Sequence, residues 1–310
     1  MRYVALAVDA APTYSVYAPI VSRIWKKFGY GTIIFLHETE KWENEYGSVI
    51  MEELEKVGAL IWFMPTMPPL SVANTMRTSR LVAACDVDKD DFILTSDVDM
   101  IPLNREFFDR KEKFVVLRAL YERWLACKTP PPVLDLNSLK PGVFRFAMCY
   151  VGATAEIWRE IFSLTVDEPV ESLRRIVDCT TDETDFDELK LSRGILSSSR
   201  AQGEVETVVP NNIWRTGELF LVDPMGLPNL SSYYNMPRGM LRLGDLWQPG
   251  RGLPPPEAID FIPDRFTPTN RPWWCLEATA LYHPNERAWL EEYRGKMEKV
   301  FQSGGNEFWN

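Results

Sequence analysis

The sequence predicts an α/β protein with a mostly parallel central sheet flanked by helices. Over the first hundred residues, short apolar segments typical of buried strands alternate with amphipathic segments of helical spacing. This alternation favours parallel strands joined by helical crossovers. A chain of 310 residues with 45% hydrophobic content is long enough to bury one large core.

The elements of this half follow in order. The first strand is "YVALAV", and the fourth is "DFILTS". We expect strands at 3–8, 31–37, 59–65 and 91–96, and helices at 17–30, 46–58 and 71–85. Acidic residues follow the fourth strand, and open α/β sheets bind their ligands at the carboxyl ends of the strands.

The second half departs from this alternation. We expect strands at 113–120 and 144–153, helices at 154–164, 170–179 and 184–196, and a final helix at 284–302. A stretch rich in Pro, Gly, Asn and Trp runs from about 207 to 275. Because this stretch cannot build a core of its own, we expect one domain over residues 1–310.

Composition excludes several classes of protein. The net charge of −10 argues against a general nucleic-acid-binding protein, which would carry a basic face. No apolar run reaches the roughly 18 residues that a transmembrane helix needs, so no transmembrane segment is expected. The five cysteines are widely spaced and favour reduced thiols, hence a soluble, cytoplasmic protein.

Two Asp-Val-Asp triplets stand close together in the sequence. Asp97 and Asp99 follow an apolar strand, and in an extended segment their side chains would point to the same side. Such a pair can hold Mn²⁺ or Mg²⁺ through oxygen ligands, although a solvated turn is the alternative. Asp86 and Asp88 form the same triplet in a hydrophilic loop with no strand before it. The context therefore favours Asp97 and Asp99.

Residues 75–103, "TMRTSRLVAACDVDKDDFILTSDVDMIPL", resemble the central segment of nucleotide-sugar glycosyltransferases of the GT-A fold, which is Rossmann-like. In that family an arginine-bearing helix precedes the strand that delivers the D-x-D motif. The resemblance implies that Asp97 lies near the donor ribose or the metal and that Asp99 is a direct metal ligand. It also implies that Arg80, or the neighbouring Arg77, contacts the donor. A surface charge on a helix is the alternative for each arginine.

The resemblance extends over roughly residues 1–200. The loop "AVDAAPTY" would lie under the nucleotide base, with Asp9, Thr13 and Tyr14 as candidates. Gly152 would let the substrate approach the backbone, unless it serves an ordinary turn. "TDFDELKLSRGI" resembles the acidic segment that reaches the reacting sugar, which points to Asp187 or Glu188 as the catalytic carboxylate. Acidic residues also favour helix starts without any catalytic role.

Two later residues complete the set of candidates. Members of this fold that retain the anomeric configuration often use a late histidine as a further metal ligand, and His283 would match it. Arg271 could meet a phosphate. A structural role is the alternative for His283. In its general character the chain also resembles the small glycosyltransferases of large algal viruses that glycosylate chlorovirus capsids, which would place it in the host cytoplasm.

The resemblance implies a metal-dependent glycosyltransferase, for hexose or pentose, that moves a sugar from a nucleoside-diphosphate sugar donor to a glycan or glycoprotein acceptor. Residues 1–103 would form the nucleotide-binding half, 104–206 the sugar and acceptor half, and 207–310 an irregular extension. Inverting and retaining mechanisms both stay open. The alternatives are a non-catalytic nucleotide-sugar or glycan-binding protein and a phosphohydrolase of the haloacid-dehalogenase type, in which the motif lies on the first strand.

Overall fold

The computed structural model describes residues 1–117, 119–120, 145–177, 186–207, 260–261, 276, 279–280 and 282–303. The described strands form a seven-stranded sheet in the order β10-β6-β9-β4-β1-β2-β3. These strands are β1 (Arg2–Val8), β2 (Gly31–His37), β3 (Leu60–Met64), β4 (Phe92–Thr95), β6 (Phe114–Val116), β9 (Val151–Thr154) and β10 (Val205–Thr207).

The sheet is mostly parallel. Strand β1 pairs in parallel with β2 on one side and β4 on the other, and β3 continues the parallel set beyond β2. Among the described strands of this sheet, β9 alone runs antiparallel to its neighbours, β4 and β6. Two small antiparallel ribbons complete the described strands, β5 (Ile101–Pro102) with β11 (Asp260–Phe261), and β7 (Ala119–Leu120) with β8 (Arg145–Phe146). The α/β class with a mostly parallel sheet is therefore confirmed.

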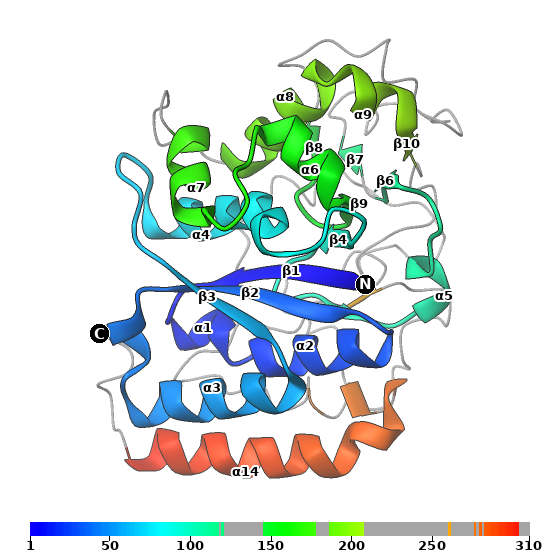
Figure 1. The fold of residues 1–310 in the computed structure, drawn as a ribbon. Coiled ribbons are helices and arrows are strands. Elements are labelled where there is room, and N and C mark those ends of the chain that lie inside the picture. Colours follow the sequence, from blue (N-terminus) through cyan, green and yellow to red (C-terminus); the bar gives the residue numbers. More distant parts are fainter. Residues whose placement is uncertain are drawn as a thin grey trace, which may run out of the picture.

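Helices cover both faces of the sheet (Figure 1). One hydrophobic core lies under α2 and α3, and α14 packs outside these helices; a second core lies under α4, α6, α7 and α8. The described helices are α1 (Pro12–Ser15), α2 (Ala18–Lys27), α3 (Glu45–Val57), α4 (Val72–Ser79), α5 (Arg105–Phe108), α6 (Ala155–Phe162), α7 (Pro169–Val177), α8 (Phe186–Ser197), α9 (Ser199–Glu204) and α14 (Arg287–Ser303), with 3₁₀ turns η1 (Thr39–Trp42), η2 (Arg80–Asp86) and η4 (Pro284–Glu286).

Local chemistry explains where these helices begin and end. The Asn44 side chain accepts a hydrogen bond from the Gly47 backbone N–H and caps the start of α3. The same helix ends at Gly58, whose φ of 73° lies in the left-handed region that glycine adopts without strain. None of the helices that the structure describes is long and apolar enough to cross a membrane.

Two predicted elements are divided in the structure. The helix expected at 71–85 is α-helical only to Ser79 and continues as the 3₁₀ turn η2. The hydroxyl groups of Thr78 and Ser79 donate to the carbonyls of Asn74 and Met76, a bonding pattern that competes with regular helix geometry. The strand expected at 144–153 consists of the separate strands β8 and β9.

Candidate functional site

The carboxyl ends of the parallel strands bring several predicted residues to one edge of the sheet. Asp9 follows β1, and Asp97 lies two residues after the end of β4. Because β1 and β4 are parallel neighbours, these two aspartates end up at the same edge. The first residues after β1 include Thr13 and Tyr14, both partly exposed on α1. The structure thus gathers the candidates from the first strand and the D-x-D motif at one edge.

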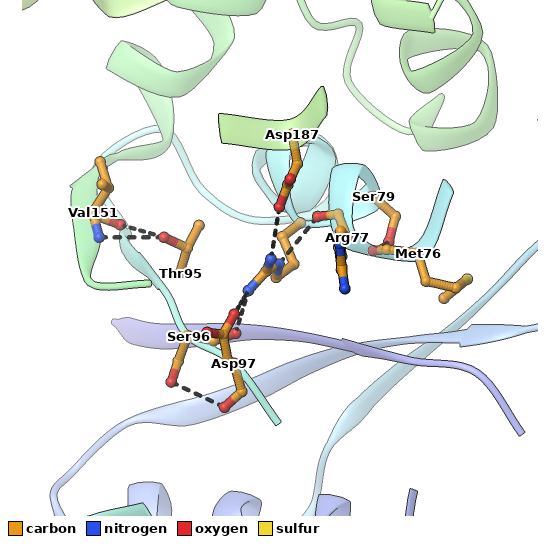
Figure 2. A network of polar contacts seen from close by, with 9 residues as sticks. Met76, Arg77, Ser79, Thr95, Ser96, Asp97, Val151 and Asp187 are labelled. Carbon is orange, nitrogen blue, oxygen red and sulfur yellow. Dashed lines mark hydrogen bonds and ion pairs between the residues drawn. The ribbon is translucent and has the colours of Figure 1, made fainter. Parts of the chain in front are cut away.

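The centre of this edge is a buried arginine. The Arg80 side chain is 4% exposed and lies between two carboxylates that are distant in sequence. Its Nη1 is 2.5 Å from Asp97 Oδ1, and its Nη2 is 3.1 Å from Asp187 Oδ2 (Figure 2). Arg80 Nη1 also donates to the Ser96 carbonyl, and Nε donates to the Arg77 carbonyl. Arg80 therefore links the end of β4 to the first turn of α8.

Asp187 is held inside the protein rather than at its surface. Its side chain is 5% exposed, and it reaches Arg80 from the first turn of α8. Burial raises the pKa of Asp187, the charge of Asp97 raises it further, and Arg80 opposes both effects. The neighbouring Glu188 is partly exposed. The two acidic candidates therefore have different environments, one in a buried ion pair and one near solvent.

The D-x-D motif does not continue the strand as expected. Strand β4 ends at Thr95, and the motif forms a turn in which the Met100 N–H donates to the Asp97 carbonyl. Val98 is buried, whereas Asp97 and Asp99 are partly exposed. The directions of the Asp97 and Asp99 side chains are therefore set by the turn. The alternation of side chains along an extended strand, which was the expectation, does not predict them.

The chemistry of this turn fits a hard divalent cation. Two carboxylates supply the oxygen ligands that Mg²⁺ and Mn²⁺ prefer, and phosphate oxygens and water can complete such a site. Within the described ranges, no three His, Cys, Asp or Glu side chains are grouped so that they could hold a metal ion. A cation here would therefore depend on ligands in addition to Asp97 and Asp99.

Asp9 is a second carboxylate at this edge with a shifted pKa. Burial raises its pKa, while the Ala11 backbone N–H, which donates to Asp9 Oδ1 at 3.1 Å, and the charges of His37 and Arg77 lower it. Arg77 is exposed, and its side chain extends from α4 beside the Arg80 network in Figure 2. Arg77 thus lies within electrostatic reach of Asp9.

His37 also lies at this edge, although it was not among the site residues predicted from the sequence. It ends β2, is buried, and its Nε2 is 2.8 Å from Thr66 Oγ1. Glu38 Oε1 lies 3.4 Å from the same nitrogen and accepts a hydrogen bond from Thr66 Oγ1. A polar residue directly after the apolar run "GTIIFL" was the signal that could have identified it, as it did for Asp97.

His283 is buried against the short strand β5. Its Nε2 lies 3.0 Å from the Pro102 carbonyl oxygen. Burial lowers its pKa, which favours the neutral form of the ring that a metal ligand requires. Its role as a metal ligand stays a prediction. Arg271, also predicted at the donor, lies outside the described residues.

Gly152 has a packing role in the structure. It lies inside β9, paired with Leu94 of β4, rather than in a strand-to-helix turn. A Cβ atom at this position would lie 2.4 Å from Phe92 Cζ. The close approach of the Phe92 ring accounts for this glycine without a ligand, and the ordinary turn given as the alternative is not found. A role of Gly152 toward the substrate stays a prediction.

A cavity of about 330 Å³ lies at the opposite edge of the sheet. Its lining includes Asp86 and Asp88 of the first triplet, together with Asp91 and Asp167. Because Asp86, Asp88 and Asp91 precede β4, whereas Asp97 follows it, the cavity is separate from the Arg80 network. The two triplets thus occupy opposite edges of the sheet.

Comparisons with known proteins identify similar folds but no family. No family model and no curated protein matches the chain. Similar solved structures include the galactosyltransferase LgtC in complex with donor and acceptor sugar analogs, with 15% identity over 72% of this chain and 79% of that one and a TM-score of 0.41. An active-site mutant of LgtC shows 14% identity over 96% and 100% of the two chains, with a TM-score of 0.44.

A third similar structure is the glycosyltransferase GlyE of Streptococcus pneumoniae TIGR4, with 12% identity over 84% of this chain and 55% of that one and a TM-score of 0.38. With such low identities and TM-scores, none of these likenesses supports a functional argument. The functional conclusion therefore depends on the residues at the carboxyl edge.

Proposed function

We propose that the protein is a metal-dependent glycosyltransferase that moves a sugar from a nucleoside-diphosphate sugar to a glycan or glycoprotein acceptor. The observation that carries this proposal is the cluster at the carboxyl edge of the sheet, where Arg80 joins the D-x-D turn to Asp187. Carboxylates and arginines at this edge of an open sheet are suited to a diphosphate and its cation.

In this proposal Asp97 and Asp99 hold Mn²⁺ or Mg²⁺. Such a cation neutralises the charge that develops on the departing diphosphate. Asp9 and the first turn of α1 lie at the neighbouring strand end and would bind the nucleotide base. Arg77, which is exposed on α4, would offer its positive charge to the phosphates.

The acceptor hydroxyl requires a carboxylate as well. An inverting enzyme needs a general base on the acceptor hydroxyl, and a retaining enzyme needs a group on the opposite face of the sugar. Glu188 is partly exposed, whereas Asp187 is occupied by Arg80. We therefore assign the contact with the reacting sugar to Glu188 and the orientation of this part of α8 to Asp187.

The experiment that tests the proposal is a panel of nucleoside-diphosphate sugars offered to the purified protein with Mn²⁺. We expect at least one donor to raise the melting temperature, because a ligand that binds only the folded state stabilises it. The increase should require Mn²⁺, and prolonged incubation should release nucleoside diphosphate slowly. If no donor stabilises the protein or is hydrolysed with Mn²⁺, the proposal is wrong.

The same panel separates the competing functions. Stabilisation by a donor without any hydrolysis would indicate a binding protein. Hydrolysis of phosphate monoesters without donor binding would indicate a phosphohydrolase. The position of the motif after the fourth strand, and the ion pair that occupies Asp97, both argue against its use as a phosphatase nucleophile.

A further inference from the structure

Two arginines three residues apart have opposite environments. Arg80 has five N–H donors, and four of them are engaged by Asp97, Asp187 and the carbonyls of Ser96 and Arg77. Arg77 is exposed, and its guanidinium has no hydrogen-bond or ion-pair partner among the described residues. Arg80 therefore has little capacity left to bind a donor, whereas Arg77 retains all of it.

The position of Arg80 also changes the charge of the D-x-D turn. Asp97 and Asp99 alone would present two negative charges to a cation. The Arg80 guanidinium lies 2.5 Å from Asp97 Oδ1 and offsets part of that charge. Because Asp187 also binds this guanidinium, at 3.1 Å, Arg80 compensates the negative charge of Asp97 only in part. The attraction of the turn for a free divalent cation is therefore reduced but not abolished.

We propose that Arg80 is a positioning residue that keeps the D-x-D turn from binding a divalent cation tightly on its own, so that cation binding depends on the diphosphate, which Arg77 contacts. This inference rests on the proposed function. A nucleoside diphosphate brings negative charge and oxygen ligands that the turn lacks while Arg80 is paired with Asp97. Arg80 also keeps Asp97 in one orientation and holds the first turn of α8 against β4.

The test is a titration of the purified full chain with Mn²⁺, with and without UDP or GDP, in which the electron paramagnetic resonance signal of unbound Mn²⁺ is measured. We expect weak binding of Mn²⁺ to the wild type and much tighter binding with the nucleotide. Arg80→Met should raise the affinity for Mn²⁺ alone about tenfold, because a neighbouring positive charge is removed. Arg80→Lys should remain close to the wild type, because it keeps the charge.

Asp187→Asn and Arg77→Met provide contrasting controls. Asp187→Asn should lower the affinity for Mn²⁺ alone, because Arg80 is then shared with Asp97 only. Arg77→Met should change the affinity for Mn²⁺ alone much less than Arg80→Met does, because Arg77 is exposed, and it should weaken nucleotide binding about tenfold, because the lost contact is to phosphate. Since Asp187→Asn and Arg80→Met act in opposite directions, general damage to the fold cannot produce both results.

Two outcomes would overturn the inference. One is an Arg80→Met protein that is folded by circular dichroism and binds Mn²⁺ alone no more tightly than the wild type. If Arg80→Met does not fold, unchanged or tighter binding of Mn²⁺ alone by Asp187→Asn overturns it instead. If the wild type binds no Mn²⁺ even with nucleotide, the proposed function itself fails. If the wild type binds Mn²⁺ and changes at Arg80 do not alter that binding, only the present inference fails.

Discussion

At the scale of single residues, the burial of charged side chains distinguishes the roles at the carboxyl edge. Arg80 and Asp187 are both almost fully buried and bind each other, so each depends on the other for charge compensation. Asp97 and Asp99 are partly exposed, as ligands of an incoming cation would have to be. Asp9 is also partly exposed, and burial raises its pKa.

This raised pKa leads to a prediction for Asp9→Asn. The folded state binds the Asp9 proton more tightly than the unfolded state, so the wild type loses stability as the pH rises above the ordinary Asp value of 3.8. Asn cannot ionise and can still accept the Ala11 hydrogen bond. We expect Asp9→Asn to raise the melting temperature at pH 7 and the gain to shrink toward pH 4, as measured by thermal unfolding across pH.

The same variant should lose nucleotide-dependent stabilisation if Asp9 binds the base, because the amide replaces an acceptor carboxylate. A melting temperature that is lower than that of the wild type at pH 7 would contradict the burial argument. Unchanged nucleotide stabilisation would leave the burial argument intact but remove Asp9 from the binding site.

At the scale of elements, hydrogen bonds to a buried carboxylate on α3 hold α14 against the fold. Glu53 is 2% exposed and accepts hydrogen bonds from Lys56 at 3.0 Å, Lys296 at 2.7 Å and Trp289 Nε1 at 2.9 Å. Burial alone would raise the pKa of Glu53, but these hydrogen bonds lower it. Two of the three donors come from α14, so Glu53 anchors that helix.

We expect Glu53→Ala to lower the free energy of unfolding by about 3 kcal/mol, because three hydrogen bonds to a buried carboxylate are lost. Glu52→Ala is the matched control on the same helix. Glu52 also contacts Lys56 and Lys296 but is 54% exposed, so its loss should cost far less stability than the loss of Glu53. Denaturant unfolding of both variants checks this difference, and equal costs would contradict the anchoring role of Glu53.

The lowered pKa of Glu53 also has a pH signature. Its contribution to stability is present above the ordinary Glu value of 4.5 and is lost as the pH falls through the folded-state pKa. Wild-type stability should therefore fall more steeply in acid than that of Glu53→Gln. This dependence is opposite in sign to that of Asp9, which allows the two carboxylates to be distinguished by the same titration.

The elements also show what the sequence can and cannot predict. Strands and helices of the first half follow from local apolar patterns, and so does the position of Asp97 after β4. The antiparallel direction of β9 depends on pairing with β4 and β6, which lie far from it in the chain. The Arg80 network likewise joins residues 17 and 107 positions apart. Such long-range contacts leave no periodic signal in the sequence.

At the scale of the whole molecule, the fold separates two identical triplets. Asp97 and Asp99 lie at the carboxyl edge of the sheet, whereas Asp86 and Asp88 lie before β4 at the cavity on the other edge. Only the carboxyl edge combines the D-x-D turn with Arg80, Asp187 and the end of β1 within the described residues. The two triplets therefore form a natural pair of test and control.

The most direct measurement is the initial rate at which nucleoside diphosphate is released, with Mn²⁺, from the donor that stabilises the protein best. We expect Asp99→Ala to lower this rate roughly 100-fold, because charge stabilisation at the leaving group is lost. Asp88→Ala, exposed in the first triplet, should keep a rate close to that of the wild type. Equal rates for Asp99→Ala and the wild type would contradict metal-dependent transfer at this site.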